Sequence, residues 1–343
     1  MKVDMADRHK LVLRAVIHEY IDTAEPIGSN TICRHWPLGL SPASIRNVMA
    51  DLEEMGLLWQ PHVSAGRVPT EKAFRFYVDY LLKVRKLQQR EQERIRRHYL
   101  STPLEPEEFL RRAALILSTL SDYIGMVVAP NVSLGGLKHL QFTKVSDTQI
   151  LAILISNAGI VQHKLLAGTD GLTQDELDKA SRYLNSELAG LSLIHMRQKI
   201  LQQMQEEKVR FDVLLKRALE LGEAALAELD KSDVYVEGRV KILNQPEFAD
   251  AEKMRSIFSA FEEKSKLLKL LDKSLQAAGM SIYIGSENEI DEIKEFSLVA
   301  SNYQMGSRVI GTLGVLGPTR MNYSRVIPVV DYVSELVSEF LEA

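Results

Sequence analysis

The sequence predicts an α+β protein in which a helix-rich N-terminal unit precedes a sheet domain. Residues 1–75 have helical apolar spacing and end in two short extended runs around a turn. From residue 105, strand-like runs give way to helical spacing over 173–230, and strand-like runs then return. A sheet domain interrupted by a helical insertion explains this order more simply than two unrelated domains. The length of 343 residues is enough for two or three domains.

The composition is that of an ordinary soluble protein, with 45% hydrophobic and 26% charged residues. No apolar run approaches the roughly 20 residues needed to span a bilayer. The start, MKVDMADRHK, has no apolar signal-peptide region, so we expect a cytoplasmic protein whose translation begins at Met1 or Met5. The single cysteine, Cys33, excludes an intramolecular disulfide and fits a reducing compartment.

Charge is distributed unevenly along the chain. Residues 1–100 hold 16 Lys+Arg against 12 Asp+Glu, whereas residues 101–343 hold 26 against 34. A basic N-terminal part is compatible with a polyanionic partner. Most of the excess lies in residues 76–100, where it can equally be the solvated face of a helix.

The first helix is expected over residues 7–23, because apolar residues recur there on one face. Its expected buried stripe is Leu13, Val16, Ile17, Tyr20 and Ile21. The segment AEPIG ends this helix, and a second, short helix is expected from Ser29 to about Arg34 or His35.

The third helix lies within residues 41–58, SPASIRNVMADLEEMGLL. Ser41 can cap its first turn, Pro42 suits its first position, and Gly56 suits a left-handed residue just beyond its end. We expect its buried face to consist of Ile45, Val48, Leu52 and Met55. The opposite face carries short, polar or basic side chains: Ala43, Arg46, Asn47 and Ala50.

Two short extended pieces are expected after this helix, around 57–62 and 67–69. The Ser-Ala-Gly-Arg turn between them places Gly66 and Arg67 at the tip of a β-hairpin. Pro69 restricts the second piece to a sheet edge.

A long helix is expected next, because Thr70 can cap a pattern that continues to about residue 100. Residues 76–104 form a helical linker in this interpretation, and the charged second half of the helix is expected to be a solvated spacer. A break at 101–108 separates the linker from a helix expected from about Pro106 to Tyr123.

The rest of the chain alternates between segments with the apolar spacing of strands and segments with that of helices. Residues 137–166 have the pattern of an antiparallel meander, and helices are expected from about 250 to 276. Three strands and a helix from Ser324 close the chain. Between the meander and these helices, one strong helical stripe consists of Phe211, Leu214, Leu215, Ala218, Gly222, Ala225 and Leu229.

The order helix, short helix, helix and β-hairpin is that of a winged helix-turn-helix. In such a unit Arg46 can donate two hydrogen bonds to guanine, and Asn47 can pair with adenine. Serines near helix starts and basic residues after the hairpin suit phosphates. The candidate DNA-binding residues are Ser29, Asn30, Ala43, Ser44, Arg46, Asn47, Ala50, Ser64, Gly66, Arg67, Lys72 and Arg75.

Winged helices also serve as protein-binding modules, which is the main alternative. Residues 1–75 carry nine basic and nine acidic residues, so DNA affinity would depend on local placement and on dimerisation. Steep weakening of binding with rising salt would distinguish DNA from a protein partner.

Three stretches resemble the bacterial heat-inducible transcription repressor family HrcA: residues 41–58, SAGRVPTEKAFRFYVDYL, and GTLGVLGPTRMNYSRVIPVVDYVSEL. The QPEF segment at 245–248 is also similar, and the resemblance covers essentially the whole chain. It implies a homodimeric repressor of chaperone operons that binds an inverted-repeat DNA operator, the CIRCE element. The resemblance also implies that the chaperonin GroEL maintains the active form.

The resemblance further implies a GAF-like domain that contains an inserted dimerisation domain. The expected limits are 1–75 for the winged helix-turn-helix, 76–104 for the linker, about 105–170 and 232–343 for the GAF-like domain, and about 171–231 for the insertion. GAF-like domains often bind small molecules, so a ligand-sensing regulator is the second hypothesis.

Other chemistry is not indicated. Gly311, Gly314 and Gly317 lack the Gly-Lys-Ser/Thr ending and the following helix start of a phosphate-binding loop. The eight histidines are scattered, with no metal-ligand spacing. We therefore expect neither an enzyme nor a metal or cofactor site.

Overall fold

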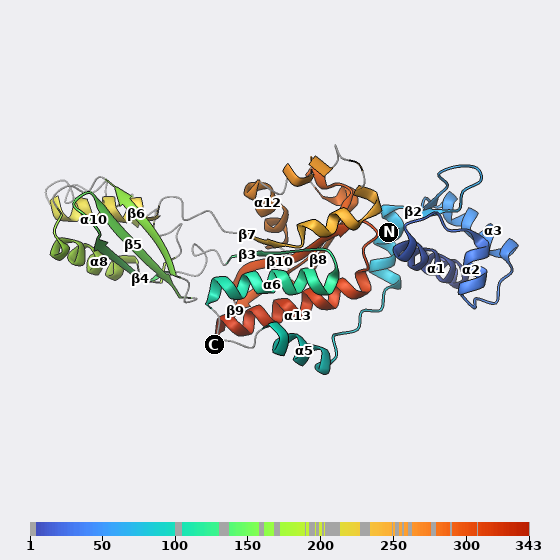
Figure 1. Ribbon diagram of the computed structural model, residues 1–343, viewed down its shortest axis with the longest axis horizontal. Coiled ribbons are helices and arrows are strands. Elements are labelled where there is room, and N and C mark those ends of the chain that lie inside the picture. The colour runs from blue at the N-terminus through green and yellow to red at the C-terminus, as the bar shows by residue number, and fades with distance from the viewer. Residues whose placement is uncertain are drawn as a thin grey trace.

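The computed structural model has the α+β content that the sequence predicts, in three parts (Figure 1). It describes residues 5–99, 105–129, 137–157, 161–167, 172–188, 190–191, 196, 199–200, 202, 213–226, 234–248, 250, 254–255, 257–259, 263–275, 279–288, 290–306 and 308–342. Within these ranges, no helix is long and apolar enough to cross a membrane.

The N-terminal unit consists of three helices followed by a two-stranded antiparallel sheet (Figure 1). Its elements are α1 (Asp7–Thr23), α2 (Ser29–His35), α3 (Pro42–Glu54), β1 (Leu58–Trp59) and β2 (Val68–Pro69). The expected bounds of the first two helices are confirmed. The stripe expected on α1 is buried, except that Tyr20 is only partly buried.

The prediction of one long helix after Thr70 is wrong, because the helix ends at Leu81 and a second helix begins only at Gln89. α4 (Glu71–Phe76) continues into a π-helical turn (Tyr77–Leu81), and Leu82 then has extended backbone angles of φ −75° and ψ 126°. Helix α5 (Gln89–Tyr99) starts afresh. The charged run has no apolar stripe to bury along a straight helix, whereas Leu81, Leu82 and Leu87 pack against the main core.

A five-stranded antiparallel sheet forms the second part, in the order β7-β3-β10-β9-β8 (Figure 1). Its strands are β3 (Ile124–Val128), β7 (Val234–Glu237), β8 (Ser281–Ile284), β9 (Phe296–Met305) and β10 (Arg308–Pro318). Short 3₁₀ turns occur at Arg239–Asn244, Pro246–Phe248, Gly285–Glu287 and Asp291–Ile293.

Helices cover both faces of this sheet. α6 (Pro106–Ser121) and α13 (Tyr323–Glu342) pack on one face, and α12 (Lys264–Leu275) packs on the other. Side chains alternate accordingly along β3, where Val127 joins the α6–α13 core and Met126 joins the α12 core. The α6–α13 core is continuous with the core of the N-terminal unit.

The third part has its own sheet and its own core. Antiparallel strands β4 (Leu137–Lys144), β5 (Gln149–Ser156) and β6 (Val161–Ala167) pack against α8 (Gln174–Leu188) and α10 (Val213–Leu226). The expected boundary near residue 170 is therefore misplaced, because it assigned this meander to the other sheet. The chain leaves the five-stranded sheet after β3 and returns at β7, which pairs with β3.

The helical stripe expected between 173 and 230 is described only in part. Ala218 and Ala225 are buried, and a Cβ at Gly222 would lie 3.1 Å from side-chain atoms of Ile200 and Leu184. Phe211, Leu229 and the side chains of Leu214 and Leu215 lie outside the described residues.

Candidate nucleic-acid interface

Helix α3 is fixed at both ends by local signals. The Ser41 side chain accepts a hydrogen bond from the backbone N–H of Ser44 at 3.2 Å, and Pro42 occupies the first turn. Gly56, beyond the last turn, has a left-handed φ of +71°. These caps fix where the helix begins and ends, and therefore which side chains it presents.

The buried face of α3 consists of Ile45, Val48, Met49 and Leu52. Met55 was expected on this face, but it is 38% exposed, and Met49 takes its place. Positions 45, 48, 49 and 52 fit a 3.6-residue period, whereas Met55 is already the C-cap residue. This stripe holds α3 to the unit, together with a hydrogen bond between Asp51 and the buried His9 of α1 at 3.0 Å.

The opposite face of α3 is exposed. Ala43, Ser44, Arg46 and Asn47 are exposed, and Ala50 is half-buried. Within the described residues, no hydrogen bond or ion pair engages the side chains of Arg46 or Asn47. Both side chains are therefore available to a partner without first breaking an internal contact.

A cleft of about 480 Å³ brings several of the predicted residues together. It lies between the start of α2, α3 and the loop of the hairpin. The cleft is lined by Ile27, Gly28, Ser29, Asn30, Arg46, Met49, Gln60, Val63, Ser64, Ala65, Gly66 and Arg67. Asn30 and Ser64 are exposed at this cleft, whereas Ser29 is buried. A hydroxyl buried in this way is poorly placed for direct phosphate contact.

The hairpin loop is held in shape by Gln60, which the sequence did not single out. Its side-chain amide donates to the carbonyls of Val63 at 2.9 Å and Ala65 at 2.8 Å. Val63 is 99% exposed, so the tip of the loop lies near residue 63. In the sequence, this role is indicated only by the position of Gln60 shortly before the predicted turn.

The expected position of Gly66 and Arg67 at the tip is wrong, because both lie at the base of the hairpin. Arg67 forms an antiparallel bridge with Ile27, with N–H···O distances of 2.9 and 2.8 Å. The Arg67 side chain is only 18% exposed, and its Nε lies 2.8 Å from Glu53 Oε2 of α3, without hydrogen-bond geometry. Arg67 is thus engaged inside the unit as an ion pair.

Gly66→Ala should destabilise the N-terminal unit by about 1–3 kcal/mol, since overpacking costs that much. A Cβ at residue 66 would lie 2.4 Å from the backbone C and O of Ile27, so the bridge between Ile27 and Arg67 would have to open. Urea unfolding measures the loss. Gly28→Ala is the matched control, because its Cβ would meet nothing closer than 4.0 Å. Equal losses in both variants would show that the close approach at Gly66 is unimportant.

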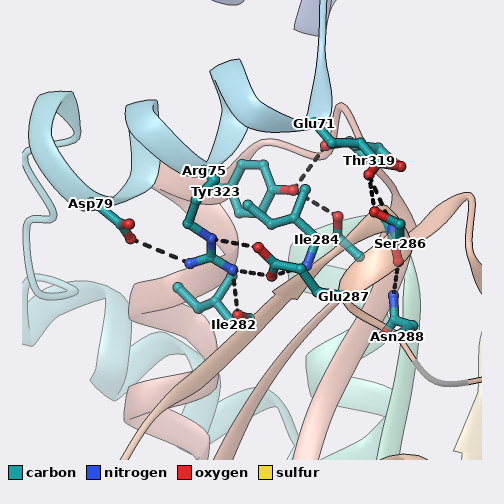
Figure 2. A network of polar contacts seen from close by, with 12 residues as sticks. Glu71, Arg75, Asp79, Ile282, Ile284, Ser286, Glu287, Asn288, Thr319 and Tyr323 are labelled. Atoms are coloured by element: carbon teal, nitrogen blue, oxygen red, sulfur yellow. Dashed lines mark hydrogen bonds and ion pairs between the residues drawn. The ribbon is translucent and has the colours of Figure 1, made fainter. Parts of the chain in front are cut away.

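The two basic residues after the hairpin are also engaged. Lys72 is exposed, and its Nζ donates to the carbonyl of Met55 at 2.9 Å, where a cation stabilises the C-terminus of α3. Arg75 is not among the residues that line the cleft, and it points toward the five-stranded sheet, where it binds Glu287 (Figure 2). Burial lowers the pKa of Arg75, but the hydrogen bonds that it donates to Glu287 and Asp79, together with their negative charges, raise the pKa on balance, so the guanidinium stays charged. In this arrangement Arg75 could contact DNA only after giving up these partners.

No group of three His, Cys, Asp or Glu side chains in the described part of the chain could hold a metal ion. The chemistry that the site offers is that of hydrogen-bond donors and acceptors on an exposed helix beside a polar cleft. Such a surface can recognise the edge of a base or a phosphate.

Comparison with known proteins gives full-length relatives. A family model described as the HrcA protein C terminal domain matches residues 107–327. A protein of Geobacter sulfurreducens named heat-inducible transcription repressor HrcA is 46% identical over 339 residues, 99% of each chain. A protein of the same name from Syntrophobacter fumaroxidans is 44% identical over 99% of this chain and 98% of its own. The crystal structure of a hypothetical protein at 2.2 Å resolution, 23% identical, covers 98% of both chains with a TM-score of 0.60, which shows a shared fold.

Proposed function

The chain belongs to the HrcA family of heat-inducible transcription repressors, and we propose that it represses chaperone operons by binding an inverted-repeat operator as a homodimer. The observation that carries this proposal is the exposed Arg46–Asn47 face of α3 beside the polar cleft. The operator is of the inverted-repeat kind that the resemblance implies, the CIRCE element.

The N-terminal unit acts in this proposal as a winged helix-turn-helix, with α3 as the recognition helix and the hairpin as the wing. Arg46 donates to guanine O6 and N7, and Asn47 pairs with adenine. Asn30, Ser44 and Ser64 remain candidate phosphate contacts. Ala43 and Ala50 let the helix approach the bases closely. Lys72 adds an exposed positive charge at the far end of α3.

The five-stranded sheet with helices on both faces is the GAF-like domain of this proposal, and residues 137–226 are the inserted dimerisation unit. The face of the three-stranded sheet that carries Leu151, Ile153, Ile155, Val161 and Leu165 supports this assignment. None of these five belongs to a hydrophobic cluster of the described residues, and Val161 and Leu165 are at least half exposed. A second copy of the same face would bury them, as an isologous two-fold dimer requires.

A mobility-shift experiment tests the function. Purified protein without any metabolite should shift a DNA fragment that contains the inverted repeat, and added chaperonin GroEL should strengthen the shift. A random-sequence fragment of equal length is the control. Absence of a shift at low salt would contradict DNA binding, and an unchanged shift with chaperonin would remove the chaperonin from the mechanism.

A small-molecule sensor is the second candidate, because a pocket of about 320 Å³ lies beside α12 and β8. Lys266, Lys273, Tyr283 and Asn288 are among its lining residues, and Glu287, the partner of Arg75, lines it too. A ligand there would contact the residue that holds the N-terminal unit. A shift that requires a metabolite and ignores chaperonin would favour this function over the first.

A further inference from the structure

Within the described residues, two groups of polar contacts join α4, the helix after the N-terminal unit, and α1 to the five-stranded sheet domain. The first involves α4, which directly follows the hairpin (Figure 2). Arg75 donates from Nε to Glu287 Oε1 at 2.9 Å and from Nη2 to Glu287 Oε2 and to the carbonyl of Ile282, the latter at 2.6 Å. Its Nη1 reaches Asp79 at 3.3 Å. A bidentate arginine–carboxylate pair fixes orientation as well as distance.

Glu71, one turn before Arg75, strengthens this contact. Its carboxylate accepts hydrogen bonds from the backbone N–H of Ser286, at 3.1 Å, and from the Ser286 hydroxyl. Gly285 permits the approach, because it has a φ of +55° and a Cβ there would lie 2.0 Å from Glu71 Oε1. The turn at 285–287 is therefore shaped to receive α4.

The second contact involves the end of α1. Arg320 is 8% exposed and pairs through two nitrogens with Glu247, and it also donates to the side chain of Gln245 at 3.0 Å. Its Nη1 donates to the carbonyl of Ile21 at 2.8 Å. Carbonyls in the last turn of a helix lack intrahelical partners, so Arg320 supplies one from the other domain.

Aromatic side chains fill the space between the two contacts. The ring of Phe74 on α4 lies 6.4 Å from that of Tyr20 on α1 and 6.2 Å from that of Tyr323 on α13. Phe74 and Tyr323 are essentially fully buried. The Tyr323 hydroxyl donates to the carbonyl of Thr319 at 2.8 Å and lies 2.8 Å from the hydroxyl oxygen of Ser297, which can donate to it. A packed junction of this kind has discrete arrangements and does not bend continuously.

We propose that the contacts Arg75–Glu287 and Arg320–Ile21 are positioning contacts that set the spacing of operator half-sites which the protein accepts. The inference rests on the proposed function. A two-fold dimer presents two recognition helices, whose separation must match half-sites about 34–36 Å apart or a multiple of that distance. α3 is packed on α1, and α1 and α4 are attached to the sheet domain. The two contacts therefore fix the orientation of α3 relative to the sheet domain.

The experiment measures affinity for the inverted repeat with its native spacer, for repeats with one to five base pairs inserted, and for a single half-site. An insertion of about half a turn places one half-site on the opposite side of the DNA double helix, so that the dimer can engage only one of the two. The wild-type protein should then lose at least about tenfold in affinity. Arg75→Glu and Glu287→Arg should each weaken binding to the native spacing about tenfold and flatten the dependence on spacing, while half-site affinity stays unchanged. The double variant, with both charges exchanged, should recover the wild-type dependence.

Arg96→Glu is the matched control, because it breaks an arginine–glutamate pair between α5 and α13 that does not join the N-terminal unit to the sheet. It should keep the wild-type spacing dependence. The positioning role would be overturned if Arg75→Glu and Glu287→Arg kept the wild-type dependence on spacing. It would also be overturned if they lost as much affinity for a single half-site as for the full inverted repeat. A wild-type protein that binds no operator would instead overturn the proposed function, and the positioning role with it.

Discussion

Ile153→Glu should leave the chain folded but monomeric, and should weaken binding to the inverted repeat by about 10²–10⁴-fold, the usual contribution of a linked second site. Ile153 lies in the middle strand of the three-stranded sheet, opposite His163 of β6 and Gln141 of β4, on the face away from α8 and α10. A carboxylate there would be buried unpaired in a two-fold interface but solvated in a monomer. Analytical ultracentrifugation measures the oligomeric state, and circular dichroism checks the fold.

Leu165→Glu serves as the second variant on this face, because Leu165 is 52% exposed and the fold tolerates a charge there more easily. Thr148→Glu adds the same charge in the exposed turn between β4 and β5 and should leave the dimer intact. A stable dimer in both face variants would place the interface on another surface. Monomers that bind the operator as tightly as the wild type would show that dimerisation is not needed.

Arg46→Ala should cost about 1–3 kcal/mol of binding free energy per half-site and relax the base preference at one operator position. Its side chain makes no hydrogen bond or ion pair within the described residues, so the free energy of unfolding should change by less than about 0.5 kcal/mol. Titrations against the operator, against single-base variants of each half-site and against random DNA measure the effect.

Arg14→Ala is the control for this substitution, because Arg14 is an exposed arginine on α1 that does not line the cleft. It removes the same charge, so any loss should be small and equal on all DNA sequences. If Arg46→Ala also loses affinity equally on operator and random DNA, Arg46 contacts phosphate and the base-reading role is wrong.

The sequence predicts best what is determined by neighbouring residues. The start and end of α3 follow from Ser41, Pro42 and Gly56, and the structure confirms all three roles. Met55 was assigned to the buried face because the apolar pattern runs past the end of the helix. Its exposure follows from the C-cap position, where the helical period no longer applies.

Contacts between distant residues could not be predicted in this way. A basic residue after a wing looks equally suited to phosphate and to a carboxylate of another domain. Glu287 lies 212 positions after Arg75, and no local pattern in the sequence links them. The partner of Arg67 could not be predicted either, because the sequence pattern alone gives no reason to pair Glu53 of α3 with this arginine. The strands of the meander were predicted correctly, but the sheet to which they belong was not. β3 pairs with β7, on the far side of the insertion, and this pairing leaves β4, β5 and β6 in a sheet of their own.

A footprint of the purified protein on the promoter of its own chaperone operon tests most directly whether α3 reads operator DNA. We expect protection of both halves of an inverted repeat, with methylation of a guanine N7 in each half interfering with binding. That interference should disappear in Arg46→Ala, because the arginine contacts the N7 atom. Protection without a repeat, or N7 interference that persists unchanged in Arg46→Ala, would contradict this expectation.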